Sequence, residues 1–128
     1  MLQPDFYSFS RFTSDGNSLL EANFSLHPEH PIFAGHFPGQ PVVPGVCMLQ
    51  IIKEGLEQAL GKKLFLSQAA TIKFLSMLVP TADKEINLRA DFSVFAGEVT
   101  TSNISLSSRD EVFIKLNNAR YLFAPSAG

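Results

Sequence analysis

The stretch PGVCMLQIIKEGLEQALG, residues 44–61, decides the fold. Pro44 suits the first turn of a helix, where its missing N–H costs nothing, and Gly61 is a typical helix stop. The sequence therefore predicts a helix over Val46–Leu60. Six of the seven residues in 46–52 are apolar, so we expect the first two turns to be buried on all sides. The second half of the helix is amphipathic.

Period-two patterns on both sides of this helix predict β-strands. Apolar and polar residues alternate over Leu20–Leu26 before it, as in a half-buried strand. The segments after it that have strand character are Leu66–Phe74, Glu85–Phe95, Val99–Ser107 and Val112–Phe123. Four consecutive strands after one buried helix indicate an antiparallel sheet wrapped on that helix, an α+β fold in a single domain over residues 1–128.

The N-terminal segment is ambiguous. Phe6, Phe9 and Phe12 recur at a spacing of three. This spacing fits either a short helix or an edge strand that packs on the body of the protein, and the sequence leaves both open.

Composition excludes several function classes. The chain has 128 residues, with 10 basic and 12 acidic side chains, so its net charge of −2 offers no basic surface for nucleic acid or anionic lipid. No apolar run approaches the roughly 20 residues of a membrane span, and the N-terminus lacks a secretory signal pattern. A lone cysteine, Cys47, excludes an intramolecular disulfide and fits a reducing compartment. Its apolar neighbours favour an unreactive core thiol. We expect a cytoplasmic protein that neither binds nucleic acid nor inserts into a membrane.

Residues 28–45 have a different character. Five of the eight prolines and three of the eight glycines lie there. Such a segment does not suit a regular helix or a central strand, yet it carries apolar residues such as Ile32 and Phe33. We therefore predict a long, rigid, packed loop. Loops of that length in compact domains are typically functional.

Four polar groups in and after this loop have chemical potential. His36 lies in the stiff segment, which would hold an imidazole in place as a general base requires. Gly45 lies where the helix begins, so its free N–H can donate to a carbonyl oxygen or an oxyanion. Gln50 is polar among apolar neighbours. A buried amide without partners costs roughly 1–3 kcal/mol, so we expect it to bond to backbone, water, His36 or a ligand. Glu54 lies four residues further along, on the same helix face.

Each of these groups also has a structural interpretation. His36 fits an ordinary loop histidine, Gln50 can bond a neighbouring carbonyl, and Glu54 fits a solvated helix position. His27 and His30 have a spacing of three, but the prolines beside them forbid a helix and no cluster of cysteines or carboxylates joins them. We therefore predict no metal site.

Residues 31–46, PIFAGHFPGQPVVPGV, resemble the active-site signature of the β-hydroxyacyl-(acyl carrier protein) dehydratases, a family with the hotdog fold. Ile72-Lys73-Phe74 and Val79-Pro80 are similar to the strand and turn that follow the helix in that family. The resemblance covers about residues 20–123. It implies a long central helix wrapped by an antiparallel sheet, chains that pair through their sheets, and an active site between two chains.

The resemblance also implies a substrate and roles for single residues. The substrate would be a β-hydroxyacyl thioester on the phosphopantetheine of acyl carrier protein, with no other cofactor. His36 would remove the proton alpha to the thioester, and the N–H of Gly45 would polarise its carbonyl. Phe37 and Val46 would contact the substrate, whose acyl chain would lie in an apolar tunnel.

One departure from the family pattern leaves the activity open. The family has an acidic residue fourteen positions after the histidine, where it protonates the leaving hydroxyl, and this chain has Gln50 there. Some members have glutamine one turn later, where this chain has Glu54. An amide cannot act as a general acid at neutral pH, and such a transfer is worth about 10²–10⁴-fold.

We expect first a lyase of fatty-acid-like biosynthesis, with Glu54, water or a substrate group as proton donor. An acyl thioesterase and a non-catalytic protein that binds acyl thioesters or acyl carrier protein are the alternatives. We also expect a homodimer or higher homo-oligomer, because one helix cannot cover the sheet and also be buried over two turns. The strand Glu85–Phe95 and the proline-rich loop are expected to need a partner surface.

Overall fold

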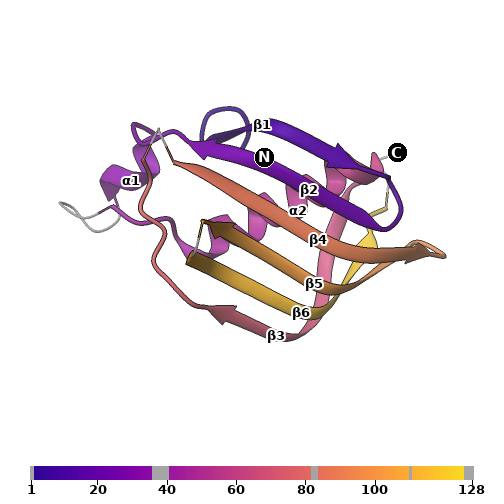
Figure 1. Ribbon diagram of the computed structural model, residues 1–128. Coiled ribbons are helices and arrows are strands. Elements are labelled where there is room, and N and C mark those ends of the chain that lie inside the picture. The colour runs from indigo at the N-terminus through magenta and orange to yellow at the C-terminus, as the bar shows by residue number, and fades with distance from the viewer. Residues whose placement is uncertain (1, 36–40, 82–83, 110, 126–128) are drawn as a thin grey trace.

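The computed structural model describes residues 2–35, 41–81, 84–109 and 111–125. An antiparallel six-stranded sheet wraps around one long helix (Figure 1). The strands are β1 (Tyr7–Ser14), β2 (Leu19–Leu26), β3 (Leu64–Phe74), β4 (Glu85–Phe95), β5 (Glu98–Ser108) and β6 (Glu111–Phe123). The helices are α1 (Pro31–Gly35) and α2 (Gly45–Leu60). The spatial order β1-β2-β4-β5-β6-β3 makes β1 and β3 the two edges. This is the α+β hotdog fold that the sequence predicted.

The core lies between α2 and the concave face of the sheet. Burial alternates along β2 and β4 as the period-two pattern predicted, and Ala22 of β2 lies opposite Leu88 of β4. The fully buried residues that meet in this layer include Leu20, Ala22, Phe24, Ile51, Ile52, Leu56, Ile86, Leu88 and Ala90. Burial of this apolar area is the main stabilising term of the fold.

The helix α2 begins and ends close to the predicted residues. Gly61 follows it in the left-handed conformation, with φ of 68°, and donates a hydrogen bond of 2.8 Å to the carbonyl of Glu57. Within the single chain its first two turns are not buried on all sides, because Val46 is 74% exposed. Val46 lies instead beside the β3 edge of the sheet, where it lines a small pocket with Phe65 and Leu66.

The proline-rich segment contains a short helix, α1, where the sequence predicted a loop without regular helix. Pro31 occupies its first residue, a position where the missing N–H is not needed. Phe33 donates its N–H to the carbonyl of His30 at 3.1 Å, and its ring packs on Phe6 with centroids 5.1 Å apart. Residues 36–40, which include the predicted site residues His36 and Phe37, lie outside the described residues.

The sheet edges correct one expectation about partner surfaces. The strand β4 lies inside the sheet between β2 and β5, so it needs no partner chain to pair with. The edge strand β3 and the connection that follows it instead carry large exposed apolar side chains. Together with the start of α2 they form the β3-edge patch: Val46, Phe65, Ile72, Phe74, Leu75, Met77 and Val79.

Candidate active site

The start of α2 is a predicted site position that the structure describes. Pro44 precedes it in an extended conformation, and Gly45 is its first residue, so the N–H of Gly45 has no acceptor within the helix. A Cβ atom at this glycine would lie 2.8 Å from Cε1 of Phe74. The absence of a side chain therefore lets the Phe74 ring approach the backbone at the positive end of the helix dipole.

An apolar pocket of about 350 Å³ adjoins Gly45. Its wall is made where the loop before α2 meets the segment after β3, joined by a hydrogen bond of 2.8 Å from the N–H of Val43 to the carbonyl of Leu78. The apolar side chains that line it are Val42, Val43, Met48, Phe74, Met77 and Leu78. A site of this character suits an alkyl chain whose carbonyl end lies at the helix N-terminus.

One turn further along α2, the structure pairs Gln50 with Glu54. The Nε2 of Gln50 donates a hydrogen bond of 2.8 Å to Oε2 of Glu54. The sequence predicts a partner for this amide and places Glu54 on the same helix face. It does not predict that Glu54 is the partner. Gln50 also lines a smaller pocket of about 220 Å³, with Val46, Leu49, Lys53, Phe65, Leu66 and Tyr121.

Glu54 is not a solvated helix residue, and that interpretation was wrong. The residue is 2% exposed, because the N-terminal segment folds across this helix face. The N–H of Leu2 donates to Oε2 at 2.8 Å, and the hydroxyl of Tyr7 donates to Oε1 at 2.9 Å. The N–H of Gln3 is a longer contact, 3.4 Å from Oε1. With Gln50, four donors converge on one carboxylate.

These contacts decide the protonation state of the cluster. Burial by itself raises the pKa of Glu54. The hydrogen bonds from Gln50, Leu2 and Tyr7 outweigh burial and hold the pKa below its ordinary value. Burial and the adjacent Glu54 carboxylate raise the pKa of the Tyr7 hydroxyl well above its usual range. At neutral pH Glu54 is therefore an ionised acceptor, and Tyr7 is a neutral donor.

Other residues singled out from the sequence lie away from this cluster. Cys47 is buried in the core, and burial raises the pKa of its thiol, as expected of an unreactive thiol. Nε2 of His27 lies 3.2 Å from the hydroxyl of Ser8. The described residues include no group of three or more histidines, cysteines or carboxylates that could hold a metal ion. None of the helices in the described ranges is long and apolar enough to cross a membrane.

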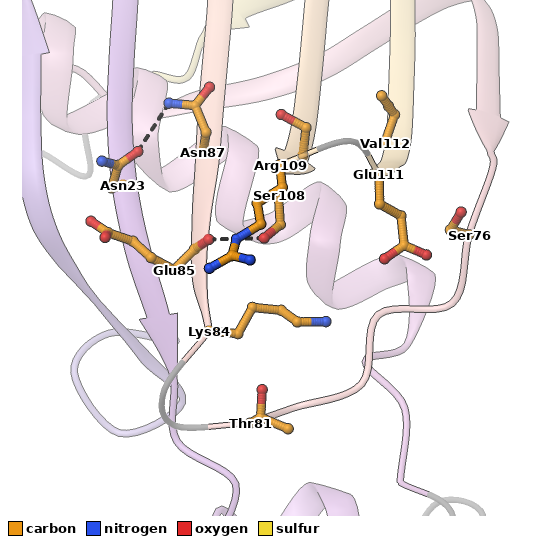
Figure 2. A pocket seen from close by; sticks show the side chains of 11 residues that line it. Asn23, Ser76, Thr81, Lys84, Glu85, Asn87, Ser108, Arg109, Glu111 and Val112 are labelled. Carbon is orange, nitrogen blue, oxygen red and sulfur yellow. Dashed lines mark hydrogen bonds between the residues drawn. The ribbon is translucent and has the colours of Figure 1, made fainter.

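A larger and more polar hollow, of about 1130 Å³, adjoins the Gly45 pocket, with which it shares Ser76 (Figure 2). Lys84 and Arg109 line it together with Glu85 and Glu111, so its charges are mixed. Several of its polar groups are paired with one another, as between the side chains of Asn87 and Asn23 at 3.0 Å. No predicted site residue lines it, and we do not assign the chemistry to it.

Comparison with known proteins agrees with this architecture. Residues 12–105 match the ApeI-like family, described as ApeI dehydratase. A 3-hydroxyacyl-(acyl-carrier-protein) dehydratase FabZ of Clostridium acetobutylicum is 38% identical over 56 residues, which cover 38% of this chain and 40% of that protein. A FabZ of Haemophilus influenzae strain PittEE is 26% identical over 96 residues, 65% of each chain. The matches therefore span less than two thirds of the length of these relatives.

A solved structure shows the same fold. The dehydratase heterocomplex ApeI:P from Xenorhabdus doucetiae contains a chain that superposes with a TM-score of 0.70 at 18% identity, covering 88% of this chain and 96% of that chain. The superposition establishes the common fold.

Proposed function

The chain belongs to the ApeI-like dehydratase family, and from this we propose that it removes water from a β-hydroxyacyl thioester carried on the phosphopantetheine of acyl carrier protein. The observation that carries the proposal is the start of α2. There a glycine N–H without an acceptor in its helix adjoins an apolar pocket of about 350 Å³. A thioester carbonyl fits at that N–H while the acyl chain lies in the pocket.

In this proposal His36 takes the proton alpha to the thioester, and the N–H of Gly45 stabilises the charge that develops on the carbonyl oxygen. Phe37 and Val46 contact the substrate beside these groups. The electron pair of the broken C–H bond forms the double bond, and the C3–O bond breaks. The leaving hydroxyl takes a proton from water. The hydroxide that this leaves then takes the proton held by His36, so His36 is neutral again. No metal or further cofactor takes part.

Glu54 enters the proposal as a positioning residue and not as the acid. Its pKa is held below the ordinary value and its oxygens are occupied by four donors, so it has no proton to give at neutral pH. Gln50 has no acidic proton either. Of the donors expected from the sequence, water and a substrate group remain, and we assign the proton to water.

The pairing of Gln50 with an ionised Glu54 favours a second candidate function, the binding of acyl thioesters without turnover. A site whose acid position holds an amide beside an ionised carboxylate binds a hydroxyacyl group without protonating it. The related structure from Xenorhabdus doucetiae is a heterocomplex. By analogy, this chain would then form a complex with a partner hotdog chain that supplies the missing acid.

We propose that the chain is one hotdog domain over residues 1–128, that it forms a homodimer in the cytoplasm, and that the β3-edge patch is the interface. An unpaired strand edge and exposed apolar side chains lie there side by side. The lone, buried Cys47 fits a reducing compartment.

One assay tests these functions together. The protein is incubated with a 3-hydroxyacyl thioester of acyl carrier protein, and enoyl product and free thiol are measured. Enoyl product supports the dehydratase, free thiol indicates a thioesterase, and binding without either indicates the second candidate. His36→Ala is expected to remove enoyl formation while the protein still folds, because the sequence predicts a loop position for His36 that contributes little to the core. Full activity in this variant would contradict the role of His36.

A further inference from the structure

The orientation of the Gln50 amide is fixed by chemistry. An ionised carboxylate is only an acceptor, so the group that Gln50 turns toward Oε2 of Glu54 must be its NH₂. The carbonyl oxygen Oε1 is the other branch of the same planar amide and therefore points elsewhere. Gln50 lines the pocket of about 220 Å³ between α2 and strands β3 and β6. Val46 lines this pocket too, and it directly follows Gly45 of the 350 Å³ pocket, so the two pockets are neighbours at the start of α2.

The support behind Glu54 is extensive. Tyr7 comes from the edge strand β1, Leu2 from the segment before it, and both donate to the carboxylate at 2.9 Å or less. Tyr7 is fully buried, with its ring packed edge-on against Phe24 at 5.5 Å between centroids. A carboxylate held from several elements leaves the amide of Gln50 one orientation that satisfies it.

We propose that Glu54 is a positioning residue that presents Oε1 of Gln50 to the acyl ligand, where this oxygen accepts a hydrogen bond from the 3-hydroxyl of the acyl group. The inference rests on the proposed function, because it assumes an acyl thioester in the site. It assigns to Gln50 a role in recognition: the site distinguishes 3-hydroxyacyl groups from unsubstituted acyl groups through an acceptor.

Two stable ligands test this recognition by equilibrium binding. The amide analogue of 3-hydroxyhexanoyl-pantetheine carries the hydroxyl, and the hexanoyl analogue lacks it. We expect the wild-type protein to bind the hydroxylated ligand about 3- to 10-fold more tightly, the size of one neutral hydrogen bond. Glu54→Gln should bring this ratio to about one while leaving the affinity for the hexanoyl analogue unchanged, because a neutral amide accepts either orientation of Gln50.

Matched variants separate positioning from general damage. Glu57→Gln makes the same charge change on the same helix, at a carboxylate that accepts only the N–H of Leu64 among the described residues, and should keep the ratio. Glu54→Asp keeps a carboxylate acceptor for the Gln50 amide and should keep part of the affinity ratio between the two ligands. A ratio that survives Glu54→Gln, or an equal loss of affinity for both ligands, would overturn the proposal.

A measurement without ligand covers the case in which the wild-type protein binds neither analogue. The side-chain NH₂ signals of Gln50 are recorded by ¹⁵N–¹H spectroscopy, with Gln50→Leu to assign them. One proton shifted downfield by the carboxylate, and returned to its usual position in Glu54→Gln, supports the pairing. If that shift is present and neither analogue binds, the proposed function has failed and the recognition role fails with it. If both analogues bind and the shift is absent, the positioning role alone fails.

Discussion

At the scale of the residue, the unusual feature is a carboxylate that the fold keeps charged in the interior. Glu54 has lost almost all contact with water and has gained donors from Gln50, Tyr7 and the backbone of Leu2. A buried charge is tolerated when its hydrogen bonds replace those of water. Through this side chain, hydrogen bonds connect the N-terminal segment to α2.

This charge makes stability depend on pH. Because the pKa of Glu54 in the folded protein lies below its ordinary value of 4.5, the unfolded state binds more protons between these two values. The contribution to the free energy of unfolding is fully present above about pH 4.5 and is lost as pH falls through the folded pKa. We expect Glu54→Gln to lower the free energy of unfolding at pH 7 by about 1–3 kcal/mol. It should also flatten the acid limb measured by urea unfolding. An equally steep acid limb in the variant would contradict this assignment.

The neighbouring amide provides a gain-of-function test. Gln50→Glu places a second carboxyl group where Nε2 now lies, 2.8 Å from Oε2 of Glu54. Two carboxyl groups this close share a proton, so the pKa of one is raised and a proton donor exists at neutral pH. Enoyl formation should rise by up to about 10²–10⁴-fold if proton donation limits the rate. Gln58→Glu makes the same change at an exposed position of α2 and should leave the rate unchanged. No gain in Gln50→Glu, with ligand binding intact, would favour the thioester-binding function.

At the scale of the element, the sequence pattern predicted the bounds of those strands and helix ends that neighbouring residues determine. The strand β4 has the predicted bounds, and α2 ends where Gly61 was expected to stop it. The N-terminal strand stayed ambiguous because a bulge between Phe9 and Arg11 shifts the register. Phe9 and Phe12 therefore lie on one face at a spacing that a regular strand does not allow.

The candidate site was only partly predictable for a related reason. Gly45 and Gln50 stood out because each breaks the pattern of its own neighbourhood. The environment of Glu54 depends on Leu2 and Tyr7, which are 52 and 47 positions away in the chain. A helical pattern shows which residues share a face, but it does not show which distant segment will cover that face.

The end of α2 gives a test at this scale. Gly61 has φ of 68°, and a Cβ atom there would meet nothing within 4 Å, so the cost of Gly61→Ala is conformational and not steric. We expect a loss of about 1 kcal/mol in the free energy of unfolding, measured by thermal and urea denaturation. The reverse change, Ala96→Gly at a residue with φ of 53°, should not lower Tm. An unchanged free energy of unfolding in Gly61→Ala would mean that the end of α2 adopts another backbone conformation at no cost.

At the scale of the whole molecule, the edge strand β3 has one unpaired side and carries exposed apolar side chains. The strand β3 pairs with β6 on one side only, and from Ala70 to Leu75 every residue is exposed. The β3-edge patch extends from this strand to Val46, and its residues line both pockets at the start of α2. A partner chain on this edge would therefore cover apolar surface and close the pockets of the site in one step.

The interface is tested by a charge on β3. The wild-type protein should run in light scattering at twice its 14.1 kDa, and Ile72→Lys should shift the mass toward a single chain, because a buried lysine ammonium opposes edge-to-edge pairing. Phe95→Lys is the matched control. Phe95 is 84% exposed at the end of β4, which lies inside the sheet and not at the β3 edge, so its variant should keep the wild-type mass. If the site lies between two chains, Ile72→Lys should also reduce enoyl formation and acyl-pantetheine binding together, and raising the protein concentration should restore both. A monomeric wild-type protein that gains mass and activity only with a second hotdog chain would replace the homodimer by a heterocomplex on the same edge.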